Sequence, residues 1–310
     1  MANAAVDRGL GRVTQFTSAD GTSDYTFDAT NQLTDADNSY QTDESYSYDD
    51  NGNRTNTGYN TTSNNQLEDD GTYSYLYDEE GNRTKRTHNT TSYETEYKWD
   101  HRNRLKEFIE RDDSANVLKK VLYRYDVFDR RIVRQVDDAS PFNYDDAYIE
   151  RYAYDDASGT NSPAGGNVVL DFVNPDGTGG DPLALERRYL YGDAVDQILA
   201  QEDVTQSTSS ADRVLWPLTD NLGTVRDLSK NDATLGEHYE YNSFGEVQSG
   251  DTSVTRYLFT GRELDEETGL QTNRARWFDP AVGRWISEDP IGFEAGDGNL
   301  ARYVGNGVVN

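Results

Sequence analysis

The sequence has 310 residues, and its 57 acidic and 29 basic side chains give a formal net charge of −28. A charge of this size repels phosphate backbones and anionic lipid, so we expect no nucleic-acid partner and no binding to membrane surfaces. The absence of cysteine excludes disulfides and thiolate zinc sites. No apolar run is long enough to span a bilayer, so no membrane insertion is expected, and the N-terminus does not resemble a signal peptide.

One phrase recurs along the chain: an aromatic residue, any residue, a second aromatic residue, and then Asp or Asn. The copies are Tyr25/Phe27/Asp28, Tyr46/Tyr48/Asp49, Tyr75/Tyr77/Asp78, Tyr97/Trp99/Asp100, Tyr123/Tyr125/Asp126, Tyr152/Tyr154/Asp155 and Tyr239/Tyr241/Asn242, and Tyr189/Tyr191 is a looser copy that ends in Gly192-Asp193. Between the first six Asp positions the intervals are 21, 29, 22, 26 and 29 residues. Such irregular spacing fits a hairpin unit whose loops vary in length.

The phrase predicts β-hairpins. Aromatic residues at positions i and i+2 share a face only in an extended strand. The Asp that follows favours a turn, because its carboxylate can accept hydrogen bonds from the backbone amides just ahead. A second strand then begins, often with Arg, at Arg54, Arg83, Arg104 and Arg131. We therefore expect antiparallel hairpins with Tyr on one face and Thr, Ser, Asp and Arg on the other, and very little helix.

The predicted elements follow in chain order. The opening twenty residues and the Thr/Asn/Ser-rich stretch 55–65 are expected to be loop-like. A full hairpin is expected over 103–126, with strands at 105–109 and 117–125 and a turn at 112–114. Gly, Asn and Pro then become frequent, which predicts a long loop. The predicted organisation is a hairpin array over 1–160, a loop over 161–182 with a possible short strand at 168–170, and a less repetitive segment over 183–310.

The C-terminal third carries five ordered motifs within about ninety residues. They are DNLGTVR at 220–226, FTGRELDEETGL at 259–270, RARWFDP at 274–280, GRWISEDPIG at 283–292 and NLARYVGN at 299–306. With the aromatic phrase, these motifs resemble the YD-repeat/Rhs family and its repeat-associated core. Two departures are visible: Gln271-Thr272-Asn273 stands where the family usually has tyrosines, and the sequence stops at Asn310, before the family's second Asp-Pro-x-Gly.

The resemblance implies an all-β fold in which a spiral of antiparallel hairpins forms a shell, a partial shell or a barrel, as in Tc-toxin C components and teneurins. In many family members the shell encloses a C-terminal toxin, and an aspartic-protease-like site in the core releases it. By motif position, Arg276 and Asp289 correspond to two parts of that catalytic site, and the second Asp would lie beyond Asn310. The structural alternative is that Asp289-Pro290 is a turn and Arg276 its ion-pair partner.

The remaining candidate motifs are explained better as structural elements than as metal-binding sites. Asp49, Asn51 and Asn53 alternate oxygen ligands, but the Gly and the bidentate Glu of an EF-hand loop do not follow, so a hairpin turn is favoured over a calcium site. His88, His101 and His238 have no second ligand at the spacing of a zinc motif, so we predict no metal site and no cofactor.

The resemblance implies a structural β-shell segment of a polymorphic-toxin-like protein that is secreted or displayed at the cell surface. Its expected partners are a toxin cargo absent from this sequence or neighbouring shell segments, with self-association through open strand edges. One alternative is a surface adhesion module that binds glycans through rows of exposed Tyr and Asn or Asp. Another is a self-cleaving peptidase whose site is incomplete here, and we expect no complete enzyme.

The acidity has two interpretations. One is adaptation to high salt, and the other is a polar lining of the shell. The first interpretation predicts that thermal stability rises in molar KCl.

Overall fold

The computed structural model describes residues 3–7, 11–138, 140, 142, 144, 147–155, 166–175 and 183–309. Regular structure in these ranges is almost all antiparallel strand, which confirms the predicted all-β fold. The helical elements there are the short 3-10 segments η1 (Ala211–Arg213), η2 (Phe259–Gly261), η3 (Gly292–Ala295) and η4 (Val304–Asn306). In the same ranges no helix has the length and apolar character needed to cross a bilayer.

The strands form a meander in which neighbours in sequence are neighbours in the sheet. An N-terminal sheet contains β1 (Asn3–Asp7), β2 (Arg12–Thr17), β3 (Thr22–Phe27), β4 (Leu33–Asn38) and β5 (Glu44–Ser45). A 15-stranded sheet contains β6 (Tyr59–Thr61), β7 (Leu67–Asp70), β8 (Tyr73–Tyr77), β9 (Arg83–His88), β10 (Glu94–Trp99), β11 (Leu105–Arg111), β12 (Val117–Tyr125), β13 (Arg131–Asp137), β14 (Tyr148–Tyr154), β15 (Val168–Asn174), β16 (Ala184–Tyr191), β17 (Ile198–Asp203), β18 (Val214–Thr219), β19 (Val225–Lys230) and β20 (Leu235–His238). Two small sheets follow, one of β21 (Glu240–Tyr241) and β22 (Val247–Ser249), the other of β23 (Glu263–Asp265), β24 (Leu270–Asn273), β25 (Arg276–Asp279) and β26 (Arg284–Trp285).

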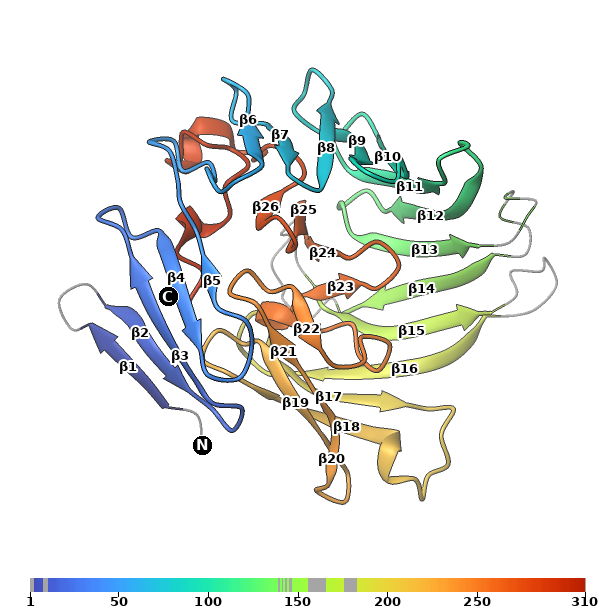
Figure 1. The fold of residues 1–310 in the computed structure, drawn as a ribbon. Helices are drawn as coiled ribbons and strands as arrows, with labels where there is room; N and C mark the ends of the chain where they lie inside the picture. The colour runs from blue at the N-terminus through green and yellow to red at the C-terminus, as the bar shows by residue number, and fades with distance from the viewer. Residues whose placement is uncertain are drawn as a thin grey trace.

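The large sheet curves around the C-terminal part of the chain. Figure 1 shows its strands following the outline of the molecule, from β6 at the top through β12–β16 at the right to β20 at the bottom. The N-terminal sheet lies at the left, and β21–β26 lie inside the curve. The C-terminal segment therefore occupies the concave side of the wall that the hairpins build.

The hairpin turns follow the chemistry expected from the Asp that ends each phrase. Asp78 is typical: its Oδ1 accepts hydrogen bonds from the backbone amides of Glu80 (3.1 Å) and Asn82 (2.8 Å). The Asp78 amide donates to the Asn82 carbonyl, and Gly81 takes the positive φ of 75° that this turn requires. The same carboxylate-to-amide pattern recurs at Asp28, Asp49, Asp100, Asp112, Asp126, Asp220 and, with an amide oxygen, Asn242.

Consecutive turns are also tied to one another. The Asn82 side chain donates from Nδ2 to Oδ1 of Asn103 in the next such turn, at 3.0 Å. Arg104, one position further along that next turn, donates from Nη1 to Oδ1 of Asp129 at 2.7 Å. These bonds connect hairpins that lie side by side, so each turn helps to fix the position of its successor.

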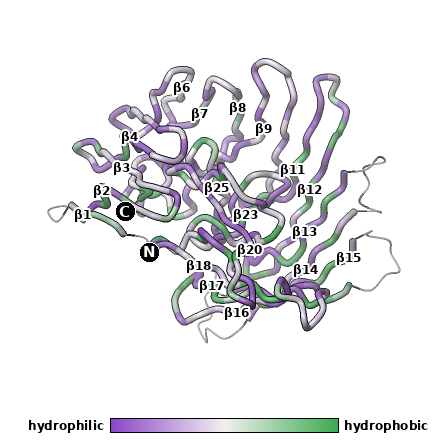
Figure 2. The backbone as a smooth tube through the Cα atoms, turned by 60° about the horizontal axis from the view of Figure 1, so that its bottom comes forward, coloured by the Kyte–Doolittle hydropathy of each residue, from purple (hydrophilic) through white to green (hydrophobic). Residues whose placement is uncertain are grey.

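Tyrosine rings supply much of the interior, as the sequence predicted. The first ring of the phrase is buried at Tyr75, Tyr97, Tyr123, Tyr152, Tyr189 and Tyr239. Most of these rings pack with apolar residues of the C-terminal segment, such as Trp277 and Phe278, in the two larger clusters of buried residues. Figure 2 shows that hydrophobic backbone segments are more frequent along β13–β18 than along β6–β9, where polar residues dominate.

The prediction that Arg lies on the face opposite the tyrosines is wrong for the arginines that begin the second strand. A bulge between Leu76 and Tyr77 sets Tyr77 directly opposite Arg83, and directly opposite residues share a face. The Arg83 guanidinium therefore lies inside, 4.5 Å from the centre of the Tyr75 ring. Arg54, Arg104 and Arg131 lie over aromatic rings in the same way.

Two stretches expected to be loop-like contain strands. The opening twenty residues include β1 and β2, because Val13 is buried on a strand that pairs on both sides. Stretch 55–65 includes β6, which pairs with β7. Within the range 161–182 that was predicted as a loop, β15 extends the possible strand at 168–170 and pairs with β14 and β16, while 161–165 and 176–182 lie outside the described residues. The division into three parts stays a prediction.

Candidate functional site

The structure brings the two predicted site residues together. Arg276 begins β25, and Asp289 follows β26 in the Asp-Pro loop. Arg276 Nη2 lies 2.9 Å from Asp289 Oδ2, and the side chains are 19% and 15% exposed. The Arg276 guanidinium also lies over the Trp285 ring, 4.0 Å from its centre. Burial lowers the pKa of Arg276, and the Asp289 charge opposes this effect.

Asp289 is both an ion-pair partner and a turn residue. Its Oδ1 accepts a hydrogen bond from the Ile291 amide at 2.9 Å, while its Oδ2 pairs with Arg276. An aspartic dyad requires a second carboxyl group that shares a proton with the first. In this arrangement both carboxylate oxygens of Asp289 already have partners, so the pair and the turn hold its side chain in place. Its role in peptide cleavage stays a prediction.

Buried ion pairs join the wall to the C-terminal segment. Arg83 Nη1 on β9 lies 2.6 Å from Asp279 Oδ2 on β25, and the two side chains are only 1% and 4% exposed. Arg134 on β13 binds Asp265 on β23 with both Nε and Nη2. Tyr123 donates its hydroxyl hydrogen to the same Asp265 carboxylate at 2.7 Å. Although burial opposes ionisation of Asp265, the neighbouring guanidinium groups hold its pKa below the ordinary value.

A third pair joins β15 to the loop before β23. Arg256 Nη2 lies 2.7 Å from Asp171 Oδ1, and the Tyr189 hydroxyl donates to the other oxygen of this carboxylate. Burial raises the pKa of Asp171, and Arg256 opposes that shift. Sequence reasoning missed these pairs, because it placed the hairpin arginines on the opposite face and gave no register between the wall and the C-terminal segment.

Polar residues of the C-terminal motifs bind turns near the start of the chain. Arg284 donates from Nη1 to Asn53 Oδ1 at 3.1 Å, and Asn299 donates from Nδ2 to the same oxygen at 2.9 Å. Asn306 donates from Nδ2 to the Gly52 carbonyl at 2.9 Å. Burial lowers the pKa of Arg284 to about 10. The motifs signalled that these three side chains matter, but their partners lie more than 200 residues away in sequence and could not be predicted.

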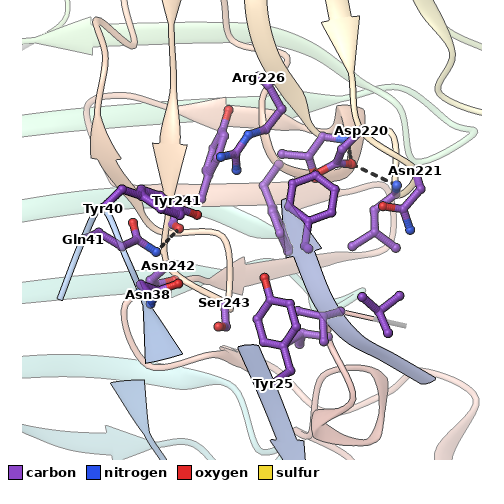
Figure 3. A pocket seen from close by; sticks show the side chains of 17 residues that line it. Tyr25, Asn38, Tyr40, Gln41, Asp220, Asn221, Arg226, Tyr241, Asn242 and Ser243 are labelled. Atoms are coloured by element: carbon purple, nitrogen blue, oxygen red, sulfur yellow. Dashed lines mark hydrogen bonds between the residues drawn. The ribbon is translucent and has the colours of Figure 1, made fainter. Parts of the chain in front are cut away.

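A small pocket separates the N-terminal sheet from the turn that follows β18. Figure 3 shows Tyr25, Tyr40 and Tyr241 around it, with Asp220 and Arg226. Burial raises the pKa of Tyr25 to about 12 and also raises the pKa of Asp220, whose Oδ1 accepts two amide hydrogen bonds of its turn. The cavity holds about 60 Å³, well below the roughly 300 Å³ at which small-molecule sites begin. The pocket is therefore a gap between packed side chains and not a small-molecule site.

The structure places the residues that the sequence analysis considered as metal ligands in two different settings. Asp49 accepts the amides of Asn51 and Asn53 with Oδ1 and the Asn53 side chain with Oδ2, so this carboxylate forms the predicted turn. His238, which has no second ligand at the spacing of a zinc motif, lies beside Asp20 and Glu240.

The comparisons with known proteins agree with this architecture. No family model matches the chain. The probable deoxyribonuclease RhsA of Dickeya dadantii is 28% identical over 224 residues, which are 68% of this chain and 13% of that protein. The toxin protein Tse5 of Pseudomonas aeruginosa is 27% identical over 201 residues, or 61% of this chain and 15% of that protein. This chain therefore spans only a small part of the length of these relatives.

Among solved structures, the TcdB2-TccC3 protein has a similar fold. The TM-score is 0.57 at 16% identity, and the match covers 99% of this chain and 18% of that chain. At this identity the likeness concerns the fold alone. It extends over the N-terminal sheet, the large curved sheet and the C-terminal segment.

Proposed function

The chain is a member of the YD-repeat/Rhs family, and from this premise we propose that it is a structural segment of a toxin shell. In this proposal the hairpins form part of the wall and the C-terminal segment closes it from the concave side. The observation that carries the proposal is the set of buried ion pairs, led by Arg83–Asp279, that fix the C-terminal segment to the wall. Encapsulation and presentation of a toxin are then the functions of the longer assembly, which acts outside the cell or at its surface.

The cavities are too small to hold a folded toxin, which favours a partial wall and not a complete container. A folded domain of 100 residues, with a radius of gyration of about 13 Å, occupies on the order of 10⁴ Å³. The most spacious of five cavities lined by described residues has about 530 Å³, and the concave side of the wall is filled by β21–β26. A toxin would therefore lie in a compartment completed by neighbouring shell segments, which are the proposed partners together with the toxin itself.

Small-angle X-ray scattering combined with a protection assay tests this proposal. A filled particle of 310 residues has a radius of gyration of about 20 Å. We expect this value for the chain, and a reporter domain fused after Asn310 should be digested by trypsin as fast as the free reporter. A clearly larger radius with a hollow scattering profile, or a reporter protected tenfold, would overturn the partial-wall proposal.

The adhesion alternative has less support. It requires rows of exposed tyrosine rings, whereas the first ring of six copies of the phrase is buried. Arginine side chains cover several of the same rings from inside. Binding of the chain to a glycan array, lost when the exposed Tyr93 is replaced by Ala, would restore this alternative.

We propose a second, conditional function for Arg276 and Asp289. The Arg276 guanidinium lies 2.9 Å from the Asp289 carboxylate, and a positive charge beside one carboxyl group suits an aspartic dyad, in which one member must be ionised. Cleavage would need a second carboxyl group supplied by residues beyond Asn310. We expect the 310-residue chain to stay intact at pH 5, and a longer chain carrying a second Asp-Pro-x-Gly to split. Splitting that persists in Asp289→Asn would refute a catalytic role for this carboxylate.

A further inference from the structure

His238 is surrounded by carboxylates that come from separate sheets. It ends β20 in the large sheet, Asp20 lies in the turn between β2 and β3 of the N-terminal sheet, and Glu240 begins β21. One ligand atom from each of these three side chains lies within 4.8 Å of the others. Histidine with two carboxylates is a common donor set for divalent ions of the first transition row.

A further carboxylate, that of Asp227, orients the His238 ring. His238 Nδ1 lies 2.7 Å from Asp227 Oδ1, on the adjacent strand and directly opposite in register. A carboxylate that accepts the hydrogen of one ring nitrogen leaves the lone pair of the other nitrogen free to bind a metal ion. The other nitrogen here is Nε2, and it faces Asp20. Asp227 stands where the supporting carboxylate of a metal-bound histidine is usually found.

Asp20 is held in a matching orientation. Its side chain is only 10% exposed, and its Oδ2 accepts hydrogen bonds from Arg226 Nη2 and Ser18 Oγ, each at 3.0 Å. The remaining oxygen, Oδ1, lies 3.0 Å from His238 Nε2. Two ligands about 2.1 Å from one ion are about 3.0 Å apart when they subtend a right angle and about 3.4 Å apart in a tetrahedral site. The observed separation therefore fits two neighbouring ligands of a single ion.

We propose that Asp20, His238 and Glu240 form a binding site for a divalent transition-metal ion such as Zn²⁺, with water completing the coordination. Because the three ligands belong to three different sheets, the bound ion clamps the N-terminal sheet onto the end of the large sheet. The site is separate from Arg276 and Asp289, and it does not depend on the shell proposal.

Equilibrium dialysis of the full chain with ZnCl₂ at pH 7.5 tests the site, with metal content measured by mass spectrometry. We expect one saturable ion per chain with a dissociation constant below about 10 μM, and a higher unfolding temperature when the ion is present. His238→Ala and Glu240→Gln should each weaken binding at least tenfold and abolish the thermal effect. Glu240→Gln leaves the His238 pairs with Asp20 and Asp227 intact, so it separates loss of a ligand from loss of the fold.

His88→Ala is the matched control, because His88 is one of only three histidines and its Nδ1 accepts backbone amides of its own turn. This variant should bind zinc like the parent chain. The proposal is overturned if no saturable binding is found, if both ligand variants retain it, or if His88→Ala weakens it equally. Substitution with Co²⁺ gives an independent result: a visible absorption band is expected for the parent chain and not for His238→Ala.

Discussion

The Arg83–Asp279 pair gives the sharpest test of how the wall holds the C-terminal segment. With an effective dielectric constant of about 20, unit charges 2.6 Å apart attract by about 6 kcal/mol, a gain that is largely offset by the desolvation of both groups. Asp279→Asn removes the attraction but leaves the guanidinium buried. We therefore expect this variant to lose about 3–5 kcal/mol of unfolding free energy.

Replacing both partners should cost much less. In Arg83→Met with Asp279→Leu, apolar side chains of similar size fill the same space and no charge is buried, so we expect less than half the loss of Asp279→Asn. Urea unfolding followed by tryptophan fluorescence measures each free energy. Lys98→Met is the control, because its pair with Glu107 has a similar length of 2.7 Å but Lys98 is 54% exposed, and its loss should be at most about 1 kcal/mol. The reasoning is refuted if Asp279→Asn loses no more unfolding free energy than this control. It is also refuted if the loss of the double variant equals the sum of the losses of the single variants Arg83→Met and Asp279→Leu.

Three further predictions concern the turns and the response to pH. Asp78→Ala should cost about 1–2 kcal/mol in urea unfolding, because two backbone amides lose their acceptor, whereas the exposed neighbour Glu79→Ala should be neutral. Gly81→Ala should cost about 1–2 kcal/mol in the same assay, since φ is 75° there; a neutral result would contradict the turn geometry. Asp265 has a pKa below its ordinary value despite burial, so its contribution to stability is present above about pH 4 and is lost as the pH falls through the lower folded value. Urea midpoints measured from pH 7 to pH 3 should fall for the parent chain, and Asp265→Asn should lack this part of the decrease.

Local chemistry made the hairpins predictable. The alternation of Tyr75 and Tyr77 indicated an extended strand, and Asp78 indicated the turn that follows, because both signals act within a few residues. The predicted hairpin over 103–126 is confirmed in outline, with strands at 105–111 and 117–125. The side on which Arg83 lies was not predictable, because it depends on a bulge that shifts the pairing register by one residue.

Long-range pairing limited the prediction of the site. The resemblance placed Arg276 and Asp289 in one site, and the structure brings them to 2.9 Å, but whether they take part in catalysis is not decided by that distance. Asp279 and Arg83 are 196 residues apart in sequence, and no local pattern relates them. The cluster around His238 was missed for the same reason, since its ligands come from three sheets that only the tertiary fold assembles.

Loops connect the strands of the wall along two opposite rims. Because the turns of one rim are bonded to one another, the two rims should differ in their tolerance of insertions. On the rim formed by the Asp turns, five residues separate the paired strands of the large sheet at five positions, including those after Tyr77, Trp99 and Tyr125, and the longer link after Tyr154 is the main departure. On the opposite rim the connections range from two to ten residues. An insertion into a described connection of that rim, such as the largely exposed 204–213, lengthens a loop, whereas an insertion on the first rim would break the bonds that pass from one turn to the next. New peptide sequences, such as affinity tags or labels, should therefore be grafted onto the variable rim.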